Sequence, residues 1–390
     1  MGIKQLFKFI SENAPKAVTV QKMENYTGRT LAIDASTCIY QFLIAVRAGA
    51  DNQYNNLTNE AGEVTSHITG FLSRTIRMLE AGLKPVYVFD GKPPEFKLAE
   101  LESRRERKEK AEEDVKLAVE SGDQDALLKA TKRTVRASQK MNDDAKKLIR
   151  LLGCPVVDAP SEAEATCAAL AKAGKVYAAV TEDMDVLTFG TPRMVKNLFS
   201  TLQGASTGGK PGKEAKPVVE IDLAIALEQL NITMDQFVDF CIMCGCDYCG
   251  TIRGVGPSGA FKSIAELKTI EAIAEATDPA KLPEGWHYAQ ARELFRNPEV
   301  TIEASTELTE PDYEGLRKFL VEENQFGADR VEKQLERLKA CRKQKTQMRL
   351  DTFFTVGKKE VKENEKFDPF ASKRAPAIKK SPAPKKARKN

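Results

Sequence analysis

Histidine is scarce in this chain of 390 residues. The two histidines, His67 and His287, stand far apart in the sequence and do not supply the clustered ligands of a zinc site. Long hydrophobic runs are also missing, since no stretch approaches the roughly 18 apolar residues that a membrane span needs. The N-terminal segment has too short an apolar stretch and no cleavage site for a secretory signal, and Leu6 stands where N-myristoylation needs Ser or Thr. These absences predict a soluble intracellular protein that does not contact membranes.

The eight cysteines do not follow a familiar metal-binding spacing. Four of them lie in CIMCGCDYC (241–249), where two Cys-x-x-Cys pairs are separated by Gly245 alone. A zinc ribbon needs a long loop between its pairs, so that four thiolates can surround one ion. We therefore interpret these cysteines as buried free thiols, with a zinc or iron–sulfur site as the alternative.

Charge is divided unevenly along the chain. Residues 357–390 contain twelve Lys/Arg and four Asp/Glu, a net charge of +8 within a chain of net charge +4, which leaves −4 for the rest. A polyanionic partner must therefore meet local basic patches, because the body of the protein as a whole repels it.

Strand-like and helix-like segments alternate, which predicts an α/β fold with a twisted, mostly parallel sheet flanked by helices. Four segments run apolar and then turn polar, as parallel strands do: TLAIDAS (30–36), KPVYVFDGKPP (84–94), GCPVVDAPSEAEA (153–165) and KVYAAVTEDMD (175–185). Helical patterns cover 66–82, 143–153 and 222–245. Residues 97–147 are dense in charge and alanine, so we expect helices there that are solvated and do not form core.

Acidic residues gather where these strands end. Ligands of open α/β sheets bind beyond the C-terminal ends of the strands, and seven carboxylates are expected near that edge: Asp34, Asp90, Glu162, Glu164, Asp183, Asp185 and Asp247. Taken singly, each has a structural alternative; Glu164, for example, completes a capping box with Ser161. Taken together, carboxylates held this close need counterions, and hard divalent cations such as Mg²⁺ supply them. Two Mg²⁺ roughly 4 Å apart suit phosphodiester cleavage.

A second chemistry is compatible with part of this pattern. Asp-Met-Asp-Val after an apolar strand loosely matches phosphatases in which the first aspartate is a nucleophile. That pattern usually has Thr or Val four places after the first aspartate, where this chain has Leu187. It also leaves Asp34, Asp90 and Glu162 without a role, so we favour the metal site.

Taken in order, the motifs resemble the eukaryotic flap endonuclease family of structure-specific 5′ nucleases. The matching pieces span residues 1–354 with gaps: MGIKQL, LAIDAS-CIYQFLIAVR, TSHITGF-RTIRMLE, KPVYVFDGKPP, APSEAEA, VTEDMDVLTFG, GCDYC–IRGVGP and QMRLDTFF. The resemblance implies 5′-flap cleavage with 5′→3′ exonuclease activity, leaving a ligatable nick in Okazaki fragment maturation and long-patch base-excision repair. The alternative, from another class, is a catalytically idle adaptor that binds DNA structures and the clamp.

The same resemblance assigns ligands and DNA contacts. It implies two Mg²⁺, with Mn²⁺ as a substitute; one lies mainly among Asp34, Asp90, Glu162 and Glu164, and the other among Asp183, Asp185 and Asp247. Tyr40 resembles a residue that stacks on a base beside the scissile phosphate, although a core tyrosine is its alternative. Lys97 and Arg104, seven residues apart and so on nearly one helix face, resemble the basic pair that reaches the attacked phosphate. Arg47 and Glu162 are further implied DNA contacts.

The glycine-rich segment GTIRGVGPSGA (250–260) resembles the helix–turn–helix with which the family grips duplex phosphates, often through a bound K⁺. Gly254 and Gly256 let the backbone approach closely. Family members commonly have basic residues after the proline, where this chain has Ser258 and Gly259. Two further departures are the longer loop over 51–63 and the Gly/Lys-rich loop over 203–216.

The C-terminal region implies partners and location. Four residues fit the sliding-clamp-binding box Q-x-x-L-x-x-F-F: Gln347, Leu350, Phe353 and Phe354. The resemblance implies binding to the clamp, proliferating cell nuclear antigen, by a monomer, with up to three per clamp trimer. Basic residues over 373–389 suit a nuclear import signal, with an electrostatic DNA tether as the alternative. We expect a nuclear protein, with the nucleolus and the mitochondrion as further compartments.

These assignments give an expected domain organisation. Residues 1–108 and 143–267 form the nuclease core, the second part including the helix–turn–helix, and 109–142 form a helical arch. Residues 268–345 supply C-terminal helices. The clamp box over 347–354 and a disordered basic tail over 355–390 follow.

Overall fold

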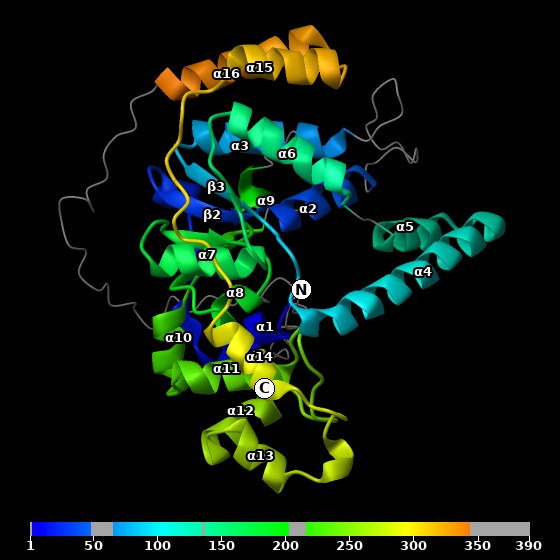
Figure 1. The fold of residues 1–390 in the computed structure, drawn as a ribbon, viewed down its shortest axis with the longest axis vertical. Helices are drawn as coiled ribbons and strands as arrows, with labels where there is room; N and C mark the ends of the chain where they lie inside the picture. The colour runs from blue at the N-terminus through cyan, green and yellow to red at the C-terminus, as the bar shows by residue number, and fades with distance from the viewer. Residues whose placement is uncertain (1, 48–64, 135–136, 203–215, 344–390) are drawn as a thin grey trace, which may run out of the picture.

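A seven-stranded sheet lies at the centre of the computed structural model, which describes residues 2–47, 65–134, 137–202 and 216–343 (Figure 1). The strands are β1 (Val18–Gln21), β2 (Thr30–Asp34), β3 (Lys84–Phe89), β4 (Val156–Asp158), β5 (Ala178–Val180), β6 (Arg193–Lys196) and β7 (Val218–Asp222). Their spatial order is β1-β7-β6-β5-β2-β3-β4. The clamp box, the basic tail, the 51–63 loop and most of the 203–216 loop fall outside the described residues.

The sheet is parallel through five neighbouring strands, from β6 through β5, β2 and β3 to β4. Strands β7 and β1 extend it antiparallel at one edge. This confirms the predicted α/β fold. The chain moves outward from β2 to β3 and β4, and then returns to the other side of β2 to form β5 and β6. The direction of winding therefore reverses between β2 and β5, where open α/β sheets leave a crevice beyond the strand ends.

Each face of the sheet is covered by helices, because parallel strands are apolar on both sides. Ile33 and Tyr87 belong to one core cluster, whereas Ala32 and Val88, their neighbours in sequence, belong to the other. The helices around the first cluster are α2 (Ala35–Arg47), α3 (Ser66–Glu80), α6 (Gln139–Leu151), α9 (Leu198–Leu202), α15 (Tyr313–Arg317), the π-helix η6 (Lys318–Glu323) and α16 (Ala328–Lys343). Helices α15 and α16 form the outermost layer on this side (Figure 1).

The opposite face carries the helices that lead to the glycine-rich turn. They are α1 (Leu6–Asn13), α7 (Ala163–Lys172), α8 (Asp185–Thr188), α10 (Leu223–Leu230), α11 (Met234–Cys244), α12 (Pro257–Leu267), α13 (Ile270–Ala276) and α14 (Tyr288–Arg296). The helix expected over 222–245 is two helices, because Asn231 takes a left-handed conformation (φ 53°) after α10. A capping box of Thr233 and Gln236 then begins α11. Single 3₁₀ turns occur at η1 (Pro15–Ala17), η2 (Met23–Tyr26), η3 (Glu95–Lys97) and η5 (Pro279–Lys281).

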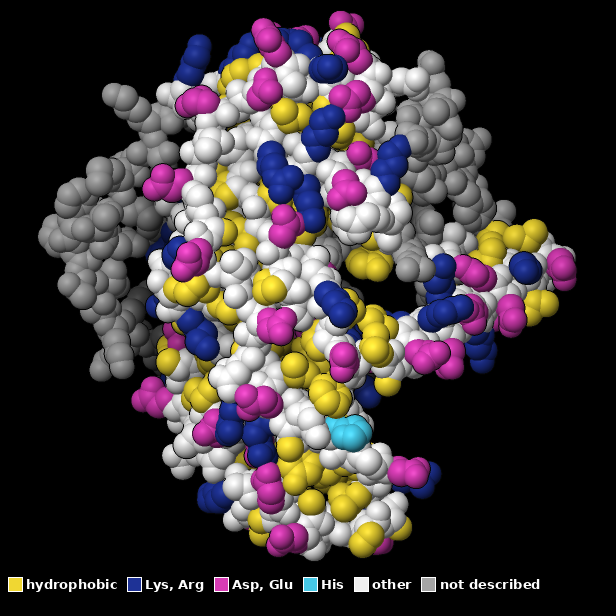
Figure 2. Space-filling model, viewed as in Figure 1, with side chains coloured by type: hydrophobic (Ala, Val, Ile, Leu, Met, Phe, Trp, Pro, Cys, Tyr) yellow, Lys and Arg dark blue, Asp and Glu magenta, His cyan; other side chains and the backbone are white. Residues whose placement is uncertain are grey.

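Helices α4 (Leu98–Ser121) and α5 (Gln124–Arg133) project away from the body of the protein (Figure 1). Many acidic and basic side chains lie on this projection, with exposed hydrophobic side chains among them (Figure 2), and Ala111 and Ala118 are the buried side chains of α4. This confirms for α4 the expectation, made for residues 97–147, of charged helices that do not form core. The expectation is wrong for the end of that range, because α6 contributes Ala145 to the core. The projection begins at Leu98, because α4 runs unbroken from its base to its tip. Within the described segments, no helix has both the length and the apolar character needed to cross a membrane.

Candidate metal and nucleic-acid site

The expected carboxylates come from neighbouring strands of the sheet. Asp34 is the last residue of β2, and Asp90 directly follows β3. Asp183 lies three residues beyond the end of β5, and Glu162 and Glu164 begin α7, which follows β4. Because β5, β2, β3 and β4 are adjacent and parallel, these side chains lie beyond the same sheet edge, at the reversal of winding between β2 and β5.

Asp34 is at the centre of this group. Its side chain is 2% exposed and accepts hydrogen bonds from the Thr37 amide at 3.0 Å and the Thr181 hydroxyl at 3.3 Å. Burial, and then the charge of Asp90, raises the pKa of Asp34 to about 6. The protein thus holds an acidic side chain in an environment that disfavours its ionised form unless a positive charge is close by.

The other carboxylates are linked electrostatically to Asp34 and to each other. Burial raises the pKa of Glu164 well above its usual range, and the charges of Asp34, Asp90 and Asp183 raise it further. The pKa of Asp185 is raised by burial and then by Asp183 and Asp247. The seven acidic residues predicted from the sequence therefore form one cluster, with Asp183 between its two halves.

Two cations reach this cluster from the base of the projection. Lys97 donates a hydrogen bond to Glu162, and its ammonium nitrogen lies 3.6 Å from Oδ2 of Asp247. Arg104 donates to Asp247 through Nη2 and to Glu100 through Nε at 3.0 Å. Burial alone would lower the pKa of Lys97, but Glu162 and the neighbouring acidic residues raise it above its ordinary value. Lys97 and Arg104, which were predicted to act together, therefore both reach Asp247.

The N-terminal segment closes one side of the cluster. The amide of Ile3 donates to Oδ1 of Asp185 at 2.7 Å. Gly2 has a φ of 68°, and a Cβ atom at Gly2 would lie 1.8 Å from Oδ1 of Asp183 and 2.2 Å from Oδ1 of Asp185. Only glycine fits this close approach. No role was predicted for Gly2 from the sequence. The feature that could have indicated one is its place in the motif MGIKQL.

The three acidic residues of VTEDMD separate in the structure. Glu182 accepts a hydrogen bond from the Asn197 amide at 2.8 Å and pairs with Lys196 at 3.5 Å. Asp183 and Asp185 turn into the cluster instead. Glu182 therefore fixes the loop after β5, whereas the next two acidic residues belong to the site.

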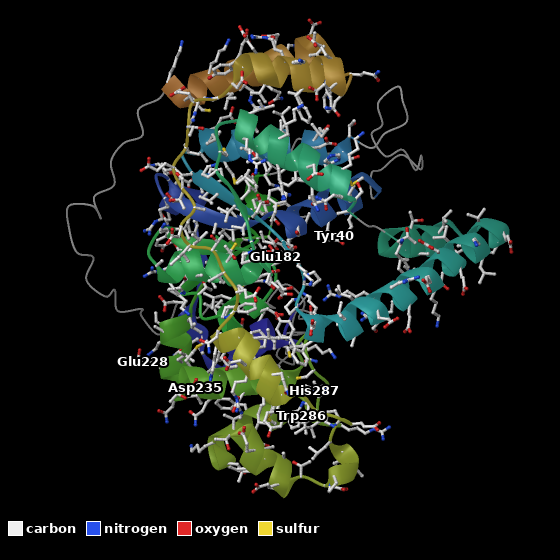
Figure 3. The ribbon with its side chains drawn as sticks, in the orientation of Figure 1. Tyr40, Glu182, Glu228, Asp235, Trp286 and His287 are labelled. Atoms are coloured by element: carbon white, nitrogen blue, oxygen red, sulfur yellow. The ribbon has the colours of Figure 1, made fainter. Side chains whose placement is uncertain are left out.

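Tyr40 lies on the side of α2 that faces the projecting helices (Figure 3). Its side chain is 38% exposed, which excludes the alternative of a core tyrosine. An exposed ring on this side of α2 is suited to stacking on a nucleobase. Arg47 is the last residue of α2, and its side chain lies outside the described structure.

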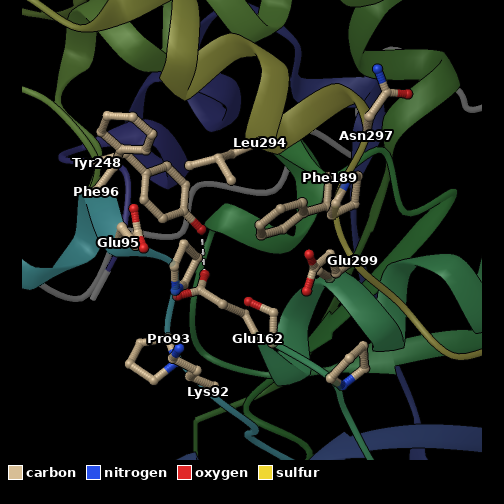
Figure 4. Close-up of a pocket in the computed structure, with 15 residues that line it drawn as sticks. Lys92, Pro93, Glu95, Phe96, Glu162, Phe189, Tyr248, Leu294, Asn297 and Glu299 are labelled. Atoms are coloured by element: carbon tan, nitrogen blue, oxygen red, sulfur yellow. Dashed lines mark hydrogen bonds between the residues drawn. The ribbon is translucent and has the colours of Figure 1, made fainter.

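Tyr248 is a site residue that the sequence analysis missed. Its hydroxyl donates to Glu162 (Figure 4), and its buried ring packs edge-on against Phe295 with ring centres 5.0 Å apart. Together with Phe96, Tyr248 and Glu162 line a pocket of about 470 Å³ beside the cluster. Tyr248 directly follows Asp247 in GCDYC, but nothing in that motif indicates a bond to a residue 86 positions away.

The glycine-rich segment connects α11 to α12 and leaves backbone open to an approaching ligand. Gly254 has a φ of 80°, and Gly256 is the N-cap of α12, with Pro257 in the first turn. No atom lies within 4 Å of the Cβ positions of either glycine. This geometry suits an anion or a cation-bridged phosphate at a helix N-terminus. The role of these residues in DNA binding stays a prediction.

The donor set of the cluster fits a hard divalent cation. Its ligand atoms are carboxylate oxygens, and burial, together with their mutual repulsion, raises the pKa of Asp34, Glu164 and Asp185. In the part of the chain that is described, no three acidic, histidine or cysteine side chains already converge on one metal position. Lys97, Arg104 and the Ile3 amide instead hold individual carboxylates. The eight cysteines are free thiols; Cys241 and Cys244 are buried as predicted, but Cys246 and Cys249 are only half-buried.

Comparison with known proteins identifies relatives over most of the chain. Sequence models of the XPG N-terminal domain and the XPG I-region match residues 1–111 and 153–247. Flap endonuclease 1-A of Sorghum bicolor is 52% identical over 358 residues, covering 91% of this chain and 90% of that protein. Flap endonuclease 1 of Caenorhabditis elegans is 49% identical over 358 residues, with the same two coverages.

Solved structures share the fold. Flap endonuclease-1 from Methanococcus jannaschii superposes with a TM-score of 0.63 and 34% sequence identity, covering 87% of this chain and 98% of that one. The catalytic core of Rad2 in complex with DNA substrate has a TM-score of 0.63 at 23% identity, covering 86% of this chain and 100% of that one. At that identity, the second likeness concerns the fold alone.

Proposed function

The chain belongs to the flap endonuclease family, and we propose that it removes 5′ flaps from branched DNA during Okazaki fragment maturation and long-patch base-excision repair. It is a structure-specific DNA nuclease, and cleavage at the flap base leaves a ligatable nick. The observation that carries this proposal is the convergence of seven carboxylates with Lys97 and Arg104 beyond the ends of β5, β2, β3 and β4. The same site provides the 5′→3′ exonuclease activity.

Divalent metal is required, as in the rest of the family, and the donor set supports two Mg²⁺ with Mn²⁺ as a substitute. Asp34, Asp90, Glu162 and Glu164 would hold one ion, and Asp183, Asp185 and Asp247 the other. Bound there, the ions supply Lewis acidity and lower the pKa of water at the scissile phosphate. The protein holds the carboxylates in place through Tyr248 and the Ile3 amide, and it brings Lys97 and Arg104 to the phosphate, where they offset developing negative charge.

The surrounding elements define how DNA reaches the site. Helices α4 and α5 form the gateway and cap for a single-stranded 5′ end, and Tyr40 stacks on a base beside the scissile phosphate. Gly254 and Gly256 approach the phosphates of the duplex, and their open backbone would hold a K⁺ ion that offsets the phosphate charge. Arg47 at the end of α2 is a further DNA contact. These roles are supported by the exposure of Tyr40 and by the open backbone at the two glycines.

A labelled 5′-flap duplex tests this function directly. We expect Mg²⁺ to support a single cut at the flap base and EDTA to abolish it, with tight binding in both conditions. A protein that binds the flap duplex but does not cut it with Mg²⁺ or Mn²⁺ would be a DNA-structure adaptor, and the proposed nuclease activity would be wrong.

Replacement of Tyr248 by phenylalanine tests how the site is held together. We expect cleavage to slow by about tenfold or more, because a hydrogen bond to a charged group contributes about 1.5–3 kcal/mol. The Mg²⁺ concentration for half-maximal activity should rise as well, since Glu162 loses the group that orients it. The only tryptophan in the chain, Trp286, donates to the Gly250 carbonyl at 2.8 Å, and we expect its fluorescence to change when metal binding moves this loop.

Tyr313→Phe, on the other face of the sheet at the start of α15, is the matched control and should change neither quantity. If Tyr248→Phe cuts at the wild-type rate with an unchanged Mg²⁺ requirement, the bond to Glu162 has no part in arranging the site.

Recruitment by the sliding clamp should be separable from cleavage. Residues 347–354 fit the clamp-binding box, and Phe353 and Phe354 supply its aromatic anchors, which typically contribute about 2 kcal/mol or more each. The double change Phe353→Ala, Phe354→Ala should remove stimulation by the clamp and leave activity on a free oligonucleotide flap near wild type. Stimulation assays with and without proliferating cell nuclear antigen measure this.

A peptide of residues 343–358 provides an independent measurement by calorimetric titration of the clamp. Equal affinity of the wild-type and double-alanine peptides would show that the motif match is accidental. The basic segment over 373–389 supports a nuclear location, as does binding to the clamp. We propose that the enzyme works as a monomer, with up to three copies per clamp trimer.

A further inference from the structure

Cys246 and Cys249 are neighbouring thiols in the loop that follows α11. Their sulfur atoms lie 3.8 Å apart, and both side chains are half-buried. Of the other six cysteines, only Cys341 is not buried. The flap endonuclease function gives this pair no role, although it lies in the cysteine-rich motif that stands out in the sequence.

The loop that contains this pair is anchored at both ends. At its start, the amide of Gly245 donates to the carbonyls of Cys241 and Ile242 at 3.2 and 3.1 Å. At its end, Trp286 Nε1 donates to the Gly250 carbonyl at 2.8 Å, and a Cβ atom at Gly250 would meet Pro283 at 3.0 Å. A change in the distance between the two sulfur atoms is therefore absorbed within the loop, by the side chains of the two cysteines and by the two residues between them.

Those two residues both contact the nuclease site. Asp247 accepts from Arg104 and lies 3.6 Å from the Lys97 ammonium, while Tyr248 donates to Glu162. One short loop thus holds a carboxylate of one predicted metal position and the group that orients a carboxylate of the other. A change in the shape of this loop therefore displaces side chains in both halves of the site.

We propose that Cys246 and Cys249 form a reversible disulfide that switches the nuclease off under oxidising conditions. A low-molecular-weight disulfide such as glutathione disulfide is the oxidant. One cysteine, as thiolate, attacks it and releases one glutathione; the second then displaces the other glutathione and closes the protein disulfide. The protein loses two electrons and two protons, which reduce one glutathione disulfide to two glutathione thiols.

The bond shortens the sulfur–sulfur distance from 3.8 Å to about 2.05 Å and fixes the torsion angle about the two sulfur atoms, and we expect the anchored loop to take up part of this change. A displacement of about 1 Å at catalytic groups can lower a rate by about 10²-fold. We expect the oxidised enzyme to cut at least about tenfold more slowly than the reduced enzyme, and a dithiol reductant to restore the rate. This switch rests on the proposed nuclease function.

The test treats the full chain with glutathione disulfide and maps disulfides by mass spectrometry of non-reduced peptides, with flap cleavage and Trp286 emission measured on the same samples. The expected result is a Cys246–Cys249 linkage, slower cleavage and a change in Trp286 emission, all reversed by dithiothreitol. A map without this linkage would overturn the proposal, and so would a complete linkage with an unchanged cleavage rate.

Single substitutions provide the controls. Cys246→Ser and Cys249→Ser should each cut like the reduced wild type and lose the response to oxidant. Cys341→Ser removes the remaining half-buried thiol and should keep the response; if it alone abolishes the response, the site of oxidation is elsewhere. If the reduced wild type does not cut at all, the nuclease function is wrong, whereas the peptide map and Trp286 emission still decide whether the disulfide forms and moves the loop.

Discussion

Replacing Asp183 or Asp185 by alanine abolishes metal-dependent cleavage of a 5′-flap duplex and leaves DNA affinity within a few fold of wild type. This is the expected result because both carboxylates lie within the acidic cluster, where the pKa of Asp185 is raised by burial and then by Asp183. We expect both carboxylates to bind the cation and not the duplex. Cleavage is measured by single-turnover assays in Mg²⁺, and binding by fluorescence anisotropy with Ca²⁺ in place of Mg²⁺.

Glu182→Gln is the matched control, since this acid stands next to Asp183 but pairs with Lys196 and accepts from the Asn197 amide. Glutamine preserves the acceptor, so this variant should cut normally. Asp185→Asn separates the loss of the charge from the loss of the hydrogen bond. Asparagine carries no charge, but its side-chain oxygen can still accept the hydrogen bond from the Ile3 amide. Substantial Mg²⁺-dependent cleavage by Asp183→Ala or Asp185→Ala would exclude the two-metal assignment.

Arg104→Ala and Lys97→Ala should each slow single-turnover cleavage by about 10²–10³-fold, with a much smaller effect on binding. Both cations lie within reach of Asp247, at the base of the helix that projects from the body of the protein. We expect them to act on charge that develops at the phosphate, so saturating DNA should not restore the rate. The measurement is the cleavage rate at saturating enzyme and at several Mg²⁺ concentrations.

The neighbouring Arg105 provides the control for this pair. Its side chain is 77% exposed and forms an ion pair with Glu109 on the surface of α4. Arg105→Ala should therefore cut at nearly the wild-type rate. If Lys97→Ala or Arg104→Ala lowers only the affinity for DNA, that residue acts as part of a solvated helix surface and not as part of the reacting site.

Some features of the fold could not be read from local patterns. The strands β1, β6 and β7 were not predicted, because polar residues such as Arg193 and Glu220 stand among their apolar ones. Strand β7 pairs antiparallel with both β6 and β1, and its pairing with β1 joins residues about 200 positions apart, such as Val18 and Ile221. Such segments become strands only when the sheet edge is present to receive them.

The sequence by itself determined where the acidic cluster forms. Near-continuous apolar runs specify buried parallel strands, and residues that directly follow them must share one edge of the sheet; Asp34, Asp90 and Asp183 are therefore placed by local pattern alone. The charged composition of α4 likewise determined that it could not enter the core.

Only the tertiary structure decided how these groups are used. Local pattern does not distinguish Glu182 from Asp183, and the packing of β6 assigns one to Lys196 and leaves the other in the cluster. The bonds from Tyr248 to Glu162 and from Arg104 to Asp247 join residues 86 and 143 positions apart. The periodicity of apolar residues indicates which side of a helix or strand is buried. A contact between distant segments depends instead on how the helices and strands pack against one another.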